Sequence, residues 1–193
     1  MTHIGCYQVK VQINALAQDN AFLSPASIDD IPNNWSCNWV NFWKNTNFEC
    51  QNIVKIVYQD EVWGLVHYGL YPYLYPNSVP PRFLEIEHIE AHPTSRGEIA
   101  GRFMEPIGKW LIWYATQVAL KFCQAQSDDP LVILEALDTA VSYYRDKVQM
   151  EYLGFARSTP GEDLYGFRFS RTAAEAFCQR HESQWGGAIQ YEQ

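Results

Sequence analysis

The stretch PRFLEIEHIEAHPTSRGEIAG, residues 81–101, predicts a strand, a tight loop and a helix start, and the rest of the chain is organised around it. Apolar and polar residues alternate from Phe83 to Ala91, as in a β-strand, where successive side chains point to opposite faces. Pro93 cannot donate a sheet hydrogen bond, so the strand is expected to stop before it. The alternation predicts one face with Leu84, Ile86, His88 and Glu90, and another with Phe83, Glu85, Glu87, Ile89 and Ala91.

The residues after this strand bring a cation and permissive backbone to a predicted helix start. Arg96, Gly97 and Gly101 precede apolar residues at helical spacing, which predict a long helix from Ile99 to Gln124 with an early kink at Pro106. The first N–H groups of a helix lack partners within the helix and favour anions. We therefore predict a phosphate-binding loop here.

Residues 93–101 resemble the pyrophosphate loop of the GNAT superfamily of acyl-CoA N-acyltransferases, whose pattern is Gln or Arg, two residues, Gly, one residue, and Gly or Ala. On that pattern Arg96 takes the first position and Gly101 the last, while Ile99 replaces the middle Gly, so the loop is degenerate. The resemblance implies acetyl-CoA or another acyl-CoA as cofactor. The loop residues that it implies in binding are Arg96, Gly97, Glu98, Ile99, Ala100 and Gly101.

The resemblance covers most of the chain from Ile53 onward and implies an α+β fold. The expected fold is a mixed, mostly antiparallel sheet of six or seven strands, flanked by helices and splayed between its fourth and fifth strands. A length of 193 residues with 47% hydrophobic content fits one packed domain over residues 1–193.

The net charge and the cysteine content limit which classes of partner and which cellular compartment are expected. The net charge of −8 gives no general attraction to nucleic acid or to an anionic membrane, so neither is expected as a partner. The 5 cysteines lack paired spacing and suggest reduced thiols. The amino-terminal sequence does not resemble a signal peptide, and the most apolar run, residues 110–120, is too short to span a bilayer. A soluble, cytoplasmic protein is expected.

Further elements are predicted from local patterns. A first strand is expected at residues 7–13, a helix start at Ser24-Pro25, a hairpin of residues 52–58 and 61–70, and a loop at residues 71–81. A buried strand is expected at residues 131–134, an N-cap at Asp138, strands at residues 156–158 and 165–169, and a terminal helix at residues 173–184. The resemblance adds Asp138, at the end of the fifth strand, to the cofactor-binding residues.

Four aromatic residues are predicted to form one helical face. Trp35, Trp39, Phe42 and Trp43 follow Asn34 at helical spacing. The rings either pack on the sheet or, as the resemblance implies for helices that wall the acceptor site, contact substrate through Trp35 or Trp39.

Acyl transfer to an amine requires a base for the amine and stabilisation of an oxyanion and a thiolate. Glu85 and Glu87 are the predicted bases, since burial in a cleft raises a carboxyl pKa toward neutrality. The alternative for both is an ordinary solvated or ion-paired carboxylate. The resemblance implies that the backbone at Ile89, Glu90 and Ala91 splays from its neighbour and leaves an N–H free for the cofactor.

The resemblance also implies a tyrosine acid in the helix before a Gly-Phe pair. Tyr144 matches best, with Gly154-Phe155 as the pair, although about five extra residues separate them. Tyr143 and Tyr152 remain rivals.

Two function classes follow, together with one alternative use of the central strand. The first is an acetyl-CoA-dependent N-acyltransferase that acts on a small-molecule or peptide amine, and the second is a GNAT-like binding module without activity. A homodimer formed through exposed aromatics is a further possibility. A metal site at His88, Glu90 and His92 is not expected, because the outer two lie about 13 Å apart on an extended strand.

Overall fold

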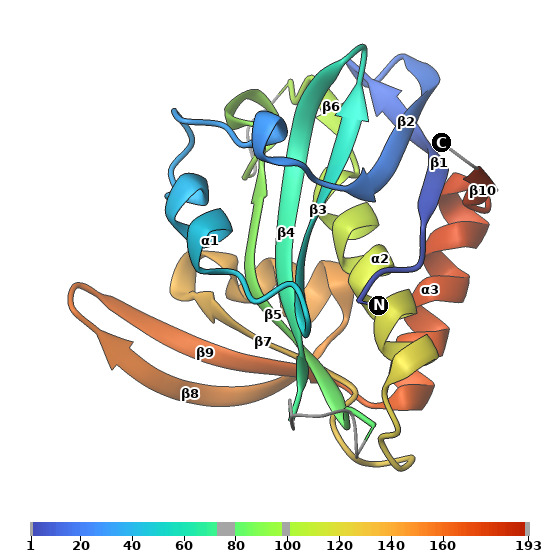
Figure 1. Ribbon diagram of the computed structural model, residues 1–193. Coiled ribbons are helices and arrows are strands. Elements are labelled where there is room, and N and C mark those ends of the chain that lie inside the picture. The colour runs from blue at the N-terminus through green and yellow to red at the C-terminus, as the bar shows by residue number, and fades with distance from the viewer. Residues whose placement is uncertain (1, 73–79, 98–100, 192–193) are drawn as a thin grey trace.

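The computed structural model describes residues 2–72, 80–97 and 101–191 and shows one large sheet with helices on both faces (Figure 1). Within these residues the sheet has 10 strands in the order β10-β1-β2-β3-β4-β5-β7-β9-β8, with β6 paired to β1. The expected six or seven strands were too few. The strands are β1 (Cys6–Ile13), β2 (Ala17–Pro25), β3 (Gln51–Tyr58), β4 (Glu61–Tyr71), β5 (Phe83–Ala91), β6 (Met104–Glu105), β7 (Val132–Leu137), β8 (Glu151–Thr159), β9 (Glu162–Phe169) and β10 (Ile189–Tyr191).

Several local predictions are confirmed, whereas the helix start at Ser24-Pro25 and the N-cap at Asp138 are wrong, since Leu137 precedes the 3-10 turn that contains Asp138. The first strand, the β3–β4 hairpin around Gln59-Asp60, the strand from Phe83 to Ala91 and the terminal helix all form near the predicted bounds. Ser24-Pro25, predicted to start a helix, instead ends β2, and only a 3-10 turn at Ile28–Asp30 follows. The predicted loop at residues 71–81 lies mostly outside the described residues.

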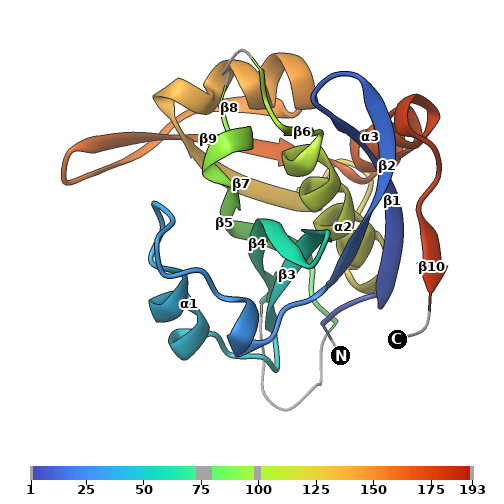
Figure 2. The same cartoon turned by 90° about the horizontal axis from the view of Figure 1, so that it is seen from above.

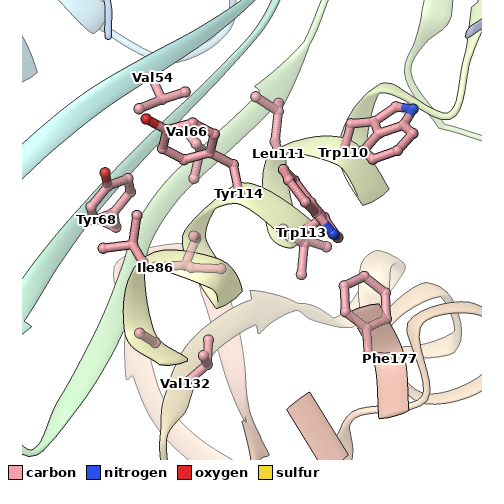
Figure 3. Close-up of a cluster of buried hydrophobic side chains, with 14 of the residues drawn as sticks. Val54, Val66, Tyr68, Ile86, Trp110, Leu111, Trp113, Tyr114, Val132 and Phe177 are labelled. Carbon is pink, nitrogen blue, oxygen red and sulfur yellow. The ribbon is translucent and has the colours of Figure 1, made fainter. Parts of the chain in front are cut away.

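The main core lies between the sheet and the helices α2 (Ile107–Phe122) and α3 (Arg171–Trp185) (Figure 3). Trp110 and Tyr114 of α2 are fully buried against the sheet. Phe177 of α3 packs into the same cluster, and the Trp113 indole donates to Glu182 of α3 at 2.7 Å. Burial of these large rings is the main stabilising contribution of the α2 layer. None of the helices in the described part of the chain is long and apolar enough to cross a membrane.

The helix α1 (Trp39–Asn45) covers the opposite face over a smaller cluster of Ile31, Trp39, Ile53 and Leu65. Its N-cap is Asn38, whose side chain accepts from the Asn41 N–H at 3.0 Å. The predicted helical face therefore lacks its first member, because Trp35 lies in an irregular segment before the helix. Phe42 and Trp43 do extend the aromatic face of α1.

The sheet opens between β5 and β7, as expected for the fourth and fifth strands of the fold. The two parallel strands pair only at Leu84–Val132, Glu85–Ile133 and Ile86–Leu134. Beyond that point β5 continues to pair with β4, and β7 with β9. The facing edges of residues 87–91 and 135–137 therefore have no ladder between them.

A β-bulge at Glu87 reverses the faces of the central strand. Ile86 pairs with Tyr68 and His88 with the next residue, His67, so Glu87 is an extra residue in β5. An extra residue moves every later side chain to the opposite face. The strict alternation predicted for this strand is thus wrong after Ile86: His88 and Glu90 join Glu85 and Glu87 toward α1, while Ile89 and Ala91 turn toward α2.

The long helix begins later than predicted. A 3-10 turn at Pro93–Ser95 follows β5, β6 then pairs with β1, and α2 starts at Ile107 after Pro106 as N-cap. The helix predicted from Ile99 and the kink at Pro106 are both wrong, because the intervening chain adds a strand to the sheet edge.

The chain after β7 returns to pair on the side of β7 that faces away from β5. A π-helical segment, Tyr143–Val148, ends with Gln149 in the left-handed conformation at φ 64°, and β8 begins at Glu151. Gly154-Phe155 therefore lies within β8, after the helical segment that contains Tyr144, and the match of the pair stays a prediction. The β8–β9 hairpin projects beyond the body of the sheet on the same side as α1 (Figure 2).

Candidate functional site

The end of β5, the first turn of α2 and the segment after β7 converge where the sheet opens. Gly64 of β4 pairs with Ala91, and a Cβ atom on Gly64 would lie 2.5 Å from Cγ2 of Ile107. On the other side, a Cβ atom on Gly108 would lie 2.9 Å from the Tyr143 hydroxyl. The opening between β5 and β7 thus has the start of α2 at one end.

Glu87 is held in a hydrogen-bond network on the α1 side of the sheet. One carboxylate oxygen accepts from Gln51 Nε2 at 2.6 Å and from the Tyr71 hydroxyl at 2.7 Å, and the other lies 3.3 Å from Nδ1 of His67. Burial and the bond to Glu87 raise the pKa of Tyr71, which keeps its hydroxyl protonated. These partners make Glu87 an anchored carboxylate.

Glu85 has the environment predicted for a base. Its side chain is half-buried next to the opening, and its pKa is raised by burial first and then by the charges of Glu87 and Glu135. A carboxyl whose pKa rises toward neutrality can accept a proton from an ammonium more effectively. Of the two predicted bases, Glu85 fits that role better.

His88 and His67 were missed as members of this face. Their residues pair across β5 and β4, and their rings lie parallel with centroids 6.1 Å apart. Phe42 of α1 stacks on His88 with centroids 3.7 Å apart. Burial is the largest cause that lowers the pKa of both histidines. The bulge that turns His88 toward His67 and Glu87 leaves no signal in the alternation of β5.

Glu90 is buried and saturated with donors. Its carboxylate accepts from the backbone N–H groups of Ser36 and Cys37 at 2.9 and 3.1 Å and from the Trp39 indole at 2.8 Å. The fourth donor is Arg96, with a nitrogen–oxygen distance of 2.9 Å. The side chain thus binds protein groups, whereas the sequence resemblance concerned the backbone at this position.

Arg96 does not lie at the start of a helix, contrary to expectation. Its guanidinium donates to Glu90 and to the Ser36 hydroxyl, on the α1 side of the sheet. Gly97 and Gly101 have φ of +69° and +82°, conformations that favour glycine. The predicted loop residues Glu98, Ile99 and Ala100 lie outside the described residues, so the effect of the isoleucine stays a prediction.

The two predicted substrate-contacting tryptophans differ in access. Trp39 is fully buried, so direct contact with a substrate is wrong for this residue. Trp35 is half-buried and lies edge-on to His92, with centroids 5.9 Å apart. Trp35, Ser36, Cys37 and Asn38 line a cavity of about 220 Å³, and a contact of Trp35 with substrate stays a prediction.

The three rival tyrosines take different positions. Tyr144 is buried with its ring 5.5 Å from that of Phe167, a residue that pairs with Leu134 where β7 leaves β5. The Tyr143 hydroxyl lies against Gly108 of α2. Tyr152 is 41% exposed on β8. Burial raises the pKa of Tyr143 and Tyr144, so both keep their protons at neutral pH. Tyr144 lies against the strand pair at which β7 leaves β5, whereas Tyr143 lies against the start of α2.

The first turn of α2 has the features that favour an anion, whereas Arg96 is engaged by Glu90. Within the described residues no side chain caps this helix and its first turn carries no acidic residue. Burial, and then the charges of Lys147 and Arg180, lower the pKa of Lys109 in that turn, and the charge of Glu105 opposes them more weakly. The unpaired N–H groups and nearby cations favour an anion there, although the protein is acidic overall. This site was missed because the helix start was placed too early.

Asp138, predicted to contact the cofactor, is exposed in a 3-10 turn directly after β7. This placement at the end of the fifth strand agrees with the resemblance, and its contact with a cofactor stays a prediction. Among the described residues, no group of three or more His, Cys, Asp or Glu side chains is arranged to hold a metal ion.

No protein-family profile matches the chain, and no curated protein matches its sequence. Solved structures do match. A GNAT-family acetyltransferase from Bacillus cereus is 14% identical with a TM-score of 0.52, over 78% of this chain and 97% of that one. A ribosomal-protein-alanine N-acetyltransferase from Brucella melitensis is 14% identical with a TM-score of 0.52, over 77% and 98%. An uncharacterised protein from Bacillus halodurans is 8% identical with a TM-score of 0.60, over 94% and 98%. At such identities the likeness is one of fold.

Proposed function

Because the chain has the fold of the GNAT acetyltransferases, we propose that it transfers an acetyl group from acetyl-CoA to an amine. The observation that carries the proposal is the opening between β5 and β7, where pairing stops after Ile86 and Leu134. An extended thioester arm bound in this opening would reach the face that bears Glu85. The acceptor is a small molecule or a peptide with a free amine.

The cofactor diphosphate is proposed to bind at the start of α2. The N–H groups of Ile107, Gly108 and Lys109 begin an uncapped helix, and Lys147 and Arg180 add positive charge. This assignment replaces the one based on Arg96, whose guanidinium is engaged by Glu90. The residues present therefore fit an anionic group at this place.

The chemistry follows from the polar face of β5. Glu85 accepts the proton of the acceptor ammonium, which leaves a neutral nitrogen able to attack the thioester carbon. N–H groups of residues 89–91 that point away from β4 stabilise the developing oxyanion, because no β7 partner pairs with them. As the C–N bond forms and the C–S bond breaks, the departing sulfur would take a proton from the Tyr144 hydroxyl, and the proton that the nitrogen loses in becoming an amide would restore the Tyr144 phenol through solvent.

The central test is titration of the protein with acetyl-CoA by calorimetry, followed by thiol release with phenethylamine, spermidine and a peptide with a free amino-terminal alanine. We expect micromolar binding and release with at least one amine. Lys147→Gln and Arg180→Gln should each weaken acetyl-CoA binding roughly two- to fivefold, the effect of one exposed ion pair. Lys121→Gln, at the other end of α2, is the matched control. Absence of heat at millimolar acetyl-CoA would refute the proposal.

A second candidate function is a binding module that has lost catalysis. The extra chain between β5 and α2, with a 3-10 turn and β6 where a tight loop was expected, favours it. Acetyl-CoA binding without thiol release for any amine in the panel would support this alternative.

A further inference from the structure

The irregular segment before α1 depends on one buried carboxylate. Residues 33–38 form no helix or strand, and the N–H groups of Ser36 and Cys37 donate to Glu90. Glu90 is 8% exposed and also receives the Trp39 indole N–H. Because partly buried backbone N–H groups need partners, this carboxylate supplies hydrogen bonds that the segment does not obtain from a sheet or a helix.

Arg96 connects this segment to the chain that leads into α2. One guanidinium nitrogen donates both to Glu90 and to the Ser36 hydroxyl. Arg96 follows the 3-10 turn after β5, and its side chain is 43% exposed. One cation therefore joins the segment before α1 to the segment between the central strand and the proposed diphosphate site.

The held segment also encloses a cavity lined by residues 32–40, two of which donate backbone N–H groups to Glu90 of β5. Trp35, Ser36, Cys37 and Asn38 are among the lining residues, and the cavity has a volume of about 220 Å³. Loss of the Glu90 carboxylate or of the Arg96 guanidinium would remove hydrogen bonds that hold these lining residues in place. Without the carboxylate, the Trp39 indole N–H would also lose its partner.

We propose that Glu90 and Arg96 are positioning residues that hold residues 33–39 as a wall of the acceptor site. The inference rests on the proposed acetyl transfer for the identity of that site. It differs from the loop resemblance in what it assigns to Arg96: the guanidinium fixes the acceptor wall and does not grip the diphosphate. The two assignments predict opposite effects of replacing Arg96.

The test compares Arg96→Gln and Glu90→Gln with wild type in the full-length protein. Hydrogen–deuterium exchange of residues 33–39 should rise tenfold or more in both variants. Calorimetry should give an acetyl-CoA Kd within twofold of wild type. With the amine that reacts best in the panel above, KM for the amine should rise tenfold or more and kcat should change less than threefold. Arg168→Gln, which removes an exposed ion pair with Glu151 on the far hairpin, is the control.

Two results would overturn the proposal. Unchanged exchange in Arg96→Gln would show that the guanidinium does not hold the segment, and a tenfold weaker acetyl-CoA Kd with an unchanged amine KM would assign Arg96 to the cofactor. If Glu90→Gln does not fold, Arg96→Gln and Ser36→Ala carry the comparison. A wild type inactive toward every amine would refute the acetyl transfer and the acceptor role together, while the exchange data would still decide whether Arg96 holds the wall.

Discussion

Replacing Gly64 by alanine should push the start of α2 away from the sheet and weaken cofactor binding. The new Cβ would lie 2.5 Å from Cγ2 of Ile107, 2.9 Å from Cδ1 of Leu111 and 3.1 Å from Cγ2 of Ile56. Carbon atoms pack best at about 3.5–4.0 Å, so the helix must move by roughly 1 Å. Ile107 cannot swing aside easily, because a β-branched residue in a helix has one strongly preferred rotamer.

The expected cost of this overpacking is about 1–3 kcal/mol, or roughly 2–12 °C in the midpoint of thermal unfolding for a chain of this size. Calorimetry should also show weaker acetyl-CoA binding, because the displaced turn carries the proposed diphosphate site. Ile107→Ala should recover part of the binding in the double variant by removing the closest contact. Gly187→Ala, where no atom lies within 4 Å of the added Cβ, is the control. A Gly64→Ala protein as stable as that control, with unaltered cofactor affinity, would refute the reasoning.

Three further predictions concern the base, a buried histidine and assembly. Glu85→Gln should lower kcat about 100-fold with little change in acetyl-CoA affinity, whereas Glu87→Gln should mainly lower the melting temperature. Equal losses of kcat in the two variants would contradict this distinction. The activity of the wild-type protein should fall as the pH drops through the raised pKa of Glu85. His181 is buried with both ring nitrogens unpartnered among the described residues, and its pKa is lowered to about 3 from 6.5. Below pH 6.5 the unfolded chain binds a proton at His181 that the folded protein does not, so the free energy of unfolding declines there, by about 2 kcal/mol at pH 5. Urea unfolding at pH 7 and pH 5 should show a smaller loss of this free energy for His181→Phe than for wild type. An identical loss in the two proteins would contradict the prediction. Phe155 and Leu153 are 59% and 52% exposed on the projecting hairpin. If a homodimer forms through these side chains, sedimentation should give a dimer for wild type and a monomer for Phe155→Ser. A 22.3 kDa species in wild type would exclude this homodimer.

Local patterns predicted much of the fold correctly. The strand from Phe83 to Ala91 has the predicted ends, since alternation and Pro93 act within a few residues of each other. The hairpin at Gln59-Asp60 and the terminal helix were predicted correctly because their signals also lie within a few neighbouring residues. β2 was missed because Asp19, Asn20 and Ser24-Pro25 disfavour a strand locally, and its pairing with β1 and β3 overrides that preference.

The site was predicted less well because its contacts are long-range. The amino-acid sequence alone determined which strand carries the carboxylates, that glycines are needed near residues 97 and 101, and which fold the chain adopts. The tertiary structure decided which side chains meet. The bulge opposite His67 turns His88 and Glu90 toward α1. Glu90 then accepts hydrogen bonds from Arg96 and from Ser36, which is 60 residues from Arg96 in the chain. Such contacts depend on the pairing register of the strands and on how many hydrogen-bond donors a buried carboxylate can accept. The spacing of residues along one strand predicts neither.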